Sequence, residues 1–297
     1  MNTQELVKVL NQKLKNTYIV FLSLVTFSLF VVMDSIAKYL ADYCNVSQII
    51  WGRYFFHLIF LFFIISISNK KINYKKNLKF QFLRSLFLIL TTIFTYYSVK
   101  YNDLINFYII FFLTPLIVYL MSNFFLKEKI SKLSLLLIVL TFCVIVYGLQ
   151  PSRLNINFNI FLPFLTVLSF ACYQLFTKLI AKDSDPFSSI FYTAFLGGIV
   201  FSIISFINWA PINDPMIWLT LVILGLVGFV SHYIFSIILS TTNLNFISSF
   251  QYSQLIIASV INYYFFQNTI DTEKMIAIIL IIIFGIIFIK NEKQRKF

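Results

Sequence analysis

Three charged side chains lie within or at the edge of long apolar stretches: Asp34, Lys38 and Arg53. Asp34 is about six residues from the end of its stretch, roughly 9 Å deep at about 1.5 Å per helical residue. Arg53 has a similar depth in the following stretch. Apolar stretches of this length are typical of membrane spans, where charge is costly and its position is a first indication of function.

Two interpretations of these charges stay open. In the functional one, Asp34 binds a cationic group or a proton, and Arg53 holds a carboxylate or phosphate through its planar guanidinium. In the structural one, Asp34 and Arg53 form an ion pair, while Lys38 extends its amine to the membrane interface. The spacing predicts a three-member charge cluster, because Lys38 is one helical turn from Asp34.

The two histidines, His57 and His232, both fall well inside apolar stretches. Each could relay a proton near neutral pH. Each could instead serve as an interhelical hydrogen-bonding group, which is the more usual role of a lone membrane histidine.

Neutral polar residues gather in the second half of the chain. Gln251 and Gln254 share one face at helical spacing, which suits a wall that reads a solute through hydrogen bonds. The alternative is hydrogen bonding between helices. The full set is Tyr173, Gln174, Gln251, Tyr252 and Gln254.

Pro115 and the Gly197-Gly198 pair are candidate structural or gating positions. Pro115 removes a backbone donor within an apolar stretch, which predicts a kink beside the site. The two glycines allow close approach of helices, with flexing as the alternative role.

No motif supports catalysis. The cysteines Cys44, Cys143 and Cys172 lack metal-ligand spacing, and the sequence contains neither His-Glu-x-x-His nor Gly-x-Ser-x-Gly. It has no phosphate-binding loop for ATP either. We therefore expect no metal, no cofactor and no enzyme activity.

The composition indicates which elements must position these residues. Of 297 residues, 60% are hydrophobic and 11% are charged, so lipid must solvate most of the surface. The net charge of +12 does not indicate nucleic-acid binding, because the basic residues stand in short connections between apolar stretches.

The apolar stretches predict an all-α membrane protein of ten transmembrane helices. They run near residues 18–40, 48–68, 81–99, 104–125, 133–150, 159–180, 187–208, 217–239, 246–265 and 274–290.

Basic residues predict that both termini are cytoplasmic, because they resist translocation in short loops. That orientation places most of the 23 basic residues inside, including Arg84 and the run from Lys70 to Lys79. Five basic residues fall on or near the outer face instead: Lys38, Arg53, Lys100, Arg153 and Lys274.

A shift of 140 residues aligns the two halves weakly but throughout, and pairs Lys38 with Lys178 and Asp34 with Gln174. Each half has five helices, an odd number, so the second half begins on the opposite side of the membrane and is inverted relative to the first. We expect a cytoplasmic segment 1–16, repeats over 17–150 and 151–290, and a cytoplasmic tail 291–297.

Segments along both halves carry a family resemblance. They are Met33 to Leu40, Gln48 to Tyr54, Leu83 to Ser85, Leu113 to Leu116 and Lys127 to Ser131, then Ala171 to Gln174 with Lys178, Phe191 to Ala194, Ser231 to Tyr233 and Phe250 to Leu255. On these residues the chain resembles the EamA-type proteins of the drug/metabolite transporter superfamily. It departs from them at Gln254-Leu255, where many members have Glu-Pro.

The resemblance implies a ten-helix transporter of the inner membrane. Members of the matching branch resemble uptake carriers for metabolites such as S-adenosylmethionine or riboflavin, whereas other members export amino acids. We therefore expect a secondary transporter that alternates access around a midplane cavity. An exporter of amino acids or drug-like compounds is the alternative within the family, and an intramembrane enzyme or sensor is the alternative outside it.

The expected partners are a small-molecule solute, a coupling proton or other ion, and membrane lipid, with no nucleic acid. The stretches 133–150 and 274–290 are the most uniformly apolar and are expected at the periphery. Lipid contact and homodimer packing both stay open for them.

Overall fold

The computed structural model describes residues 3–68, 72, 77–127, 131–149, 158–181 and 183–294, and helices account for nearly all of them. The first repeat contains α1 (Thr3–Leu40), α2 (Val46–Ser68), α3 (Leu78–Tyr101), α4 (Leu104–Phe111), α5 (Thr114–Leu126) and α6 (Lys132–Leu149). The second contains η2 (Phe158–Phe161), α7 (Leu162–Ile180), α8 (Pro186–Ile207), α9 (Pro215–Thr241), α10 (Leu244–Ser248), η3 (Ser249–Tyr252), α11 (Ser253–Tyr264) and α12 (Thr272–Gln294).

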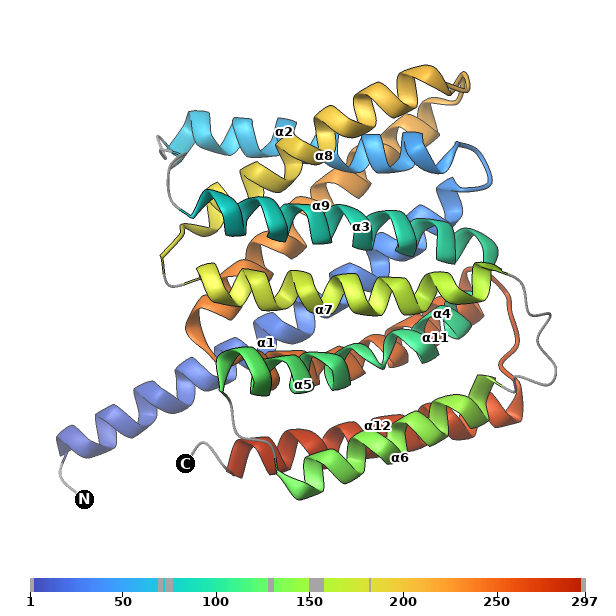
Figure 1. The fold of residues 1–297 in the computed structure, drawn as a ribbon. Coiled ribbons are helices and arrows are strands. Elements are labelled where there is room, and N and C mark those ends of the chain that lie inside the picture. Colours follow the sequence, from blue (N-terminus) through green and yellow to red (C-terminus); the bar gives the residue numbers. More distant parts are fainter. Residues whose placement is uncertain are drawn as a thin grey trace.

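Nine segments among the described residues are long and apolar enough to cross a membrane. Two of them are composite, α4 with α5 and α10 with η3 and α11. The 23-residue α12 lies lengthwise against α6 (Figure 1) and corresponds to the tenth predicted stretch. The fold class predicted from hydropathy, an all-α membrane protein of two five-helix repeats, is confirmed.

The two repeats correspond closely in their helix boundaries. The starts of α2, α4 and α6 at Val46, Leu104 and Lys132 are matched 140 residues later by those of α8, α10 and α12. The ends of α1 and α3 are matched in the same way by those of α7 and α9. Because each repeat crosses the membrane five times, the two copies run in opposite directions.

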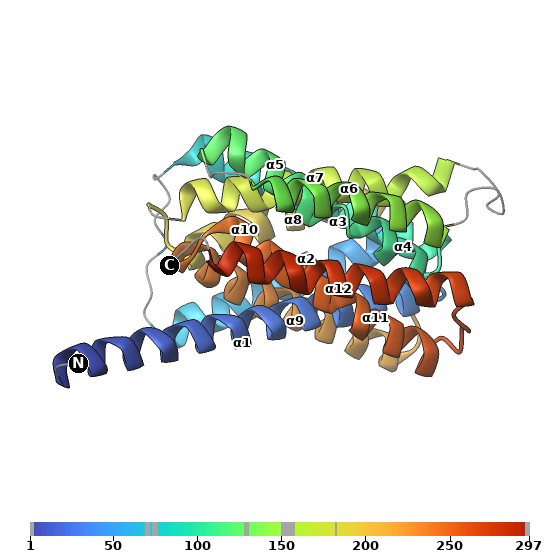
Figure 2. The ribbon, with the colours of Figure 1, turned by 90° about the horizontal axis from the view of Figure 1, so that it is seen from below.

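The repeats interlock through their first three helices. Helix α1 packs against α9, and α7 packs against α3, so the two contacts are equivalent under exchange of the halves. Helices α2 and α8, which are equivalent to each other, also pack together. The buried centre of the molecule is thus an interface between repeats, while α6 and α12 lie at one edge (Figures 1 and 2).

Glycines allow the close packing around α2. A Cβ on Gly197 of α8 would lie 2.6 Å from the ring of Tyr54, and one on Gly225 of α9 would lie 2.4 Å from Cβ of Phe56. A Cβ on Gly198 would lie 3.0 Å from Leu58. Helix approach is therefore the role that the structure gives Gly197 and Gly198.

The fourth crossing of each repeat is interrupted, a feature that the sequence analysis placed in the first repeat alone. Helix α4 ends at Phe111 and α5 begins at Thr114, directly before Pro115. In the second repeat, α10 gives way to η3 and then α11. The interruptions meet, because the rings of Phe112 and Tyr252, residues 140 apart in sequence, stack with centroids 5.4 Å apart.

The chain ends lie on one side of the bundle, as Figures 1 and 2 show. Helix α1 extends into the segment 1–16 that we expected to be separate. Glu128 and Lys129 of a family motif, and several basic residues used to predict orientation, lie outside the described residues: Lys70, Lys71, Lys75, Lys76, Arg153, Lys182, Arg295 and Lys296.

Candidate functional site

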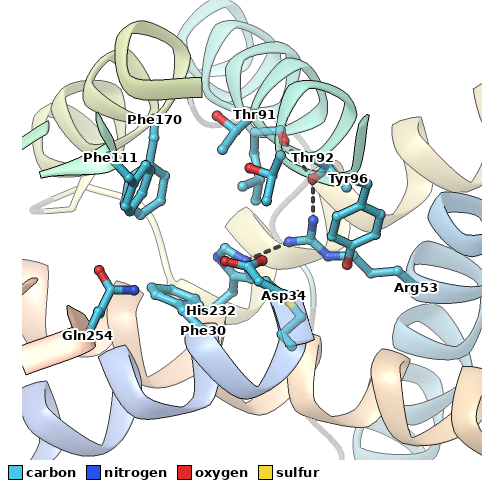
Figure 3. Close-up of a pocket in the computed structure, with 13 residues that line it drawn as sticks. Phe30, Asp34, Arg53, Thr91, Thr92, Tyr96, Phe111, Phe170, His232 and Gln254 are labelled. Carbon is cyan, nitrogen blue, oxygen red and sulfur yellow. Dashed lines mark hydrogen bonds between the residues drawn. The ribbon is translucent and has the colours of Figure 1, made fainter. Parts of the chain in front are cut away.

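A small buried cavity lies between the repeats and collects several predicted site residues. Its lining comes from α1, α2, α3 and α4 of the first repeat and from α7, α9 and α11 of the second. Asp34, Arg53, His232 and Gln254 all line it (Figure 3). Its free volume is about 30 Å³, enough for a water molecule or two. The cavity is therefore too small for an organic solute as it stands.

Arg53 enters the cavity from α2 and is 2% exposed. It donates to the hydroxyl of Thr92 on α3, and its Nη2 lies 2.7 Å from Nε2 of His232. Its guanidinium also lies over the rings of Tyr54 and Tyr96, at 5.2 Å and 5.7 Å from their centroids. These aromatic faces stabilise a cation that has left water.

The hydrogen bonds of His232 define its tautomer. A guanidinium can only donate, so Nε2 of His232 must accept from Arg53, and the ring proton resides on Nδ1. Nδ1 then donates to the hydroxyl of Tyr173, 3.0 Å away. In this arrangement His232 is neutral and links α9 to both α2 and α7.

Asp34 lines the same cavity from α1. Its Oδ2 accepts a hydrogen bond of 2.7 Å from the hydroxyl of Tyr108 on α4. The structure records no ion pair between Asp34 and Arg53, although it describes both and both line the cavity. The two side chains thus make no direct ion pair, although they interact electrostatically across a longer distance.

Lys38 does not join these charges, so the predicted three-member cluster is wrong. Its amine donates to the carbonyl oxygens of Val99 and Asn102 at the end of α3, at 2.9 Å and 3.0 Å. One turn of helix separates Lys38 from Asp34, and that turn is enough to direct its side chain toward a helix terminus. A cation at this position also complements the negative end of the α3 dipole.

Arg84 was assigned to the cytoplasmic surface, and this assignment is wrong. Arg84 is fully buried. It lies six residues into α3, where all three guanidinium nitrogens donate hydrogen bonds to the second repeat. The acceptors are Thr177 at 3.1 Å, the Ser189 carbonyl and Thr193 at 2.7 Å each, Tyr173 at 3.2 Å and Ser236 at 3.3 Å.

The two buried arginines belong to one chain of hydrogen bonds. Arg84 donates to Tyr173, Tyr173 contacts His232, and His232 accepts from Arg53. The chain joins α3, α7, α9 and α2 across the interface between the repeats. Tyr173 itself does not line the cavity, but its hydroxyl contacts the imidazole that accepts from Arg53.

The remaining predicted residues divide between the cavity and its surroundings. Gln174 and Gln251 hydrogen-bond each other at 3.0 Å, one turn away from the cavity residues Phe170 and Gln254. Tyr252 stacks on Phe112 instead of lining the cavity.

His57 is buried outside the cavity. It lies in edge-to-face contact with Phe229, and neither ring nitrogen has a hydrogen-bond partner in the described part of the chain.

Sequence reasoning missed one wall of the cavity. Thr91, Thr92, Thr95 and Tyr96 recur on one face of α3 and line it, together with the rings of Phe30, Phe111 and Phe170. A row of threonines at helical spacing within an apolar stretch was an available signal. The phenylalanines gave no such signal, because the chain contains 37 of them and nothing in the sequence distinguishes these three.

Comparison with known proteins then decides the family. A model of the EamA-like transporter family matches residues 14–147 and 157–290. The chain belongs to this family. As an EamA-like protein it is a multi-pass transporter of the membrane and not an enzyme, and its bacterial relatives indicate the inner membrane.

Two curated relatives are similar over nearly their whole length. An S-adenosylmethionine uptake transporter of Rickettsia prowazekii is 24% identical, with 92% of each chain covered. One from Rickettsia bellii is also 24% identical, over 88% of this chain and 89% of the relative. A solved crystal structure shares the fold with a TM-score of 0.68 at 14% identity, over 91% of this EamA-like chain and 94% of that one.

Proposed function

We propose that this EamA-like transporter is a secondary carrier that takes up a zwitterionic metabolite of the S-adenosylmethionine type by alternating access around the central cavity. The observation that carries the proposal is the separate presentation of Asp34 and Arg53 to one buried cavity. S-adenosylmethionine bears an ammonium, a sulfonium and a carboxylate. A cavity that offers one carboxylate and one guanidinium can hold such opposite charges at the same time.

An unsatisfied polar atom supports a ligand at the charged end. Nε of Arg53 is buried and has no hydrogen-bond partner among the described residues. Leaving such an atom unpaired costs about 1–3 kcal/mol, which favours a solute or water beside it. The carboxylate of the solute would take the guanidinium edge, and its cationic group would lie against Asp34.

The names of the relatives support the substrate class and the direction of transport. Both relatives cited above are named as uptake transporters of S-adenosylmethionine. A simple amino acid also carries an ammonium and a carboxylate, so an amino-acid exporter is the second candidate. The small cavity must widen for either solute, and the interruptions between α4 and α5 and at η3 lie close to it in the chain.

The test is uptake of labelled S-adenosylmethionine into proteoliposomes. Asp34→Asn and Arg53→Gln should each reduce uptake by at least about tenfold, because each removes a charge-assisted contact with the solute. Asp271→Asn is the matched control. Asp271 is 63% exposed, lies in the connection before α12 and does not line the cavity.

The uptake experiment has clear contrary outcomes. Wild-type rates in both cavity variants would contradict the site. Uptake of amino acids in place of S-adenosylmethionine by the wild-type protein would favour the second candidate.

A further inference from the structure

The end of the cavity away from Arg53 is aromatic. Phe30, Phe111 and Phe170 come from α1, α4 and α7 and converge there, as Figure 3 shows. The ring centroids of Phe111 and Phe170 are 5.4 Å apart, with a tilt of 34° between the planes, and those of Phe30 and Phe170 are 6.0 Å apart. Three ring faces at one end can contact a flat, uncharged group as well as a cation, so the polar groups beside them decide which is favoured.

An amide faces the same end. Gln254, at the start of α11, lines the cavity and is 1% exposed, and its Oε1 has no hydrogen-bond partner among the described residues. Figure 3 shows its side chain on the side of the cavity where Phe111 and Phe170 lie, away from Arg53.

Behind this amide, Gln251 donates to Gln174 and thereby leaves Oε1 of Gln251 and Nε2 of Gln174 without partners in the described structure. Buried polar groups are normally hydrogen-bonded, and of these three amides Gln254 is the one that lines the cavity, so its Oε1 is available to a solute.

We infer that this end of the cavity is a subsite for a planar nitrogen heterocycle, held between Phe111 and Phe170 with its polar edge on Gln254. A carboxamide presents a donor and an acceptor side by side, which matches the edge of a purine such as adenine. Aromatic side chains add stacking against the flat face of the base. The inference rests on the proposed function and fixes the direction of the solute, with its base toward α4 and α11 and its amino-acid group toward α1 and α2.

Phe111 lies next to an interruption in its membrane crossing. It is the last residue of α4, and two residues without α-helical geometry separate it from α5. The rings of Phe111 and Phe170 are in contact, so a base held between them requires them to separate. The inference therefore includes a shift of α4 at this interruption when the base binds.

Thermal stabilisation of the purified protein by each half of the solute tests the subsite. Adenosine and methionine are added separately, since a ligand that binds the folded state raises the apparent melting temperature. Phe111→Leu and Gln254→Leu should weaken the affinity for adenosine by about tenfold and leave that for methionine unchanged. Asp34→Asn should show the opposite pattern. Phe142→Leu, on the exposed face of α6, is the matched control and should retain both responses.

Several results would overturn the subsite. Adenosine that does not stabilise the wild-type protein would do so, as would equal stabilisation of the wild type and both subsite variants. If either leucine variant does not purify as a folded protein, Phe111→Met and Gln254→Asn replace it, with the same expected loss for adenosine. Failure of the proposed function is separate, because wild-type protein that binds adenosine and does not take up S-adenosylmethionine contradicts the transport proposal alone.

Discussion

Arg84 shows how a charge can remain inside a membrane without an acidic partner. Its five hydrogen bonds end on four side-chain hydroxyls and one backbone carbonyl, supplied by α7, α8 and α9. Hydrogen bonds to a charged group contribute about 1.5–3 kcal/mol each, so together they can offset much of the desolvation of a guanidinium. The residue holds one helix of the first repeat to three helices of the second.

Replacement of Arg84 should therefore destabilise the protein. Arg84→Met leaves four hydroxyls without a donor, and we expect it to lower the free energy of unfolding by about 3 kcal/mol or more. Arg84→Lys keeps the charge with fewer donors and should be intermediate. Thermal unfolding followed by intrinsic fluorescence measures both. Lys100→Met, an exposed change on the same helix, serves as control, and an unchanged melting temperature in Arg84→Met would contradict this role.

At the scale of the residue, depth in an apolar stretch predicted Asp34 and Arg53 as cavity residues, because a buried charge is expensive wherever it stands. The same argument applied to Arg84, which lies six residues inside α3. It was outweighed by the neighbouring lysines, whose charge pattern predicts a cytoplasmic loop. The partners of Asp34 could not be predicted, since Tyr108 is 74 residues away in the chain.

The ends of helices reveal the repeat more clearly than the cavity does. Lys178 of α7 donates to the carbonyl oxygens of Leu239 and Thr242 at 2.8 Å and 2.5 Å. Lys38 of α1 donates to the carbonyl oxygens of Val99 and Asn102 in the same way. Each of these three residues precedes its counterpart in the second repeat by 140 positions. In each repeat a lysine at the end of the first helix thus caps the end of the third, once at each membrane face.

Replacing either of these two equivalent lysines should destabilise the protein to a similar extent. Lys38→Met and Lys178→Met each leave two carbonyl groups without this donor and remove a cation from a helix C-terminus, which we expect to destabilise the protein by about 1–3 kcal/mol. Lys79→Met, at the exposed start of α3, should have no such effect. Differential scanning fluorimetry provides the comparison, and a loss in one lysine variant without the other would contradict the equivalence.

At the scale of the element, hydropathy located the crossings but not their interruptions. Pro115 gave a local reason for a break in the first repeat. The corresponding segment from Ser248 to Ser253 contains neither Gly nor Pro, so no sequence signal indicated η3. Its geometry depends on packing, because a Cβ on Gly285 of α12 would lie only 2.6 Å from the ring of Tyr252.

At the scale of the whole molecule, the membrane face that bears the termini is predicted from the sequence. Both ends lie on the same side (Figures 1 and 2), and the distribution of lysine and arginine predicts that this side is cytoplasmic.

Labelling in intact cells can test this orientation. A membrane-impermeant maleimide should label Asp271→Cys, in the connection before α12, and should not label Lys79→Cys at the start of α3 until the cells are opened. The unmodified protein gives the background from its three cysteines. The reverse labelling pattern would contradict the predicted orientation.

The stack of Phe112 on Tyr252 has a consequence for the direction of transport. These two rings come from equivalent places in the repeats and touch each other, so the contact lies where the halves can exchange roles. In the alternating access that we propose, rocking about this contact would open one membrane face as it closes the other. We expect such a carrier to have no fixed direction, so that the concentrations of solute on the two sides decide which way it runs.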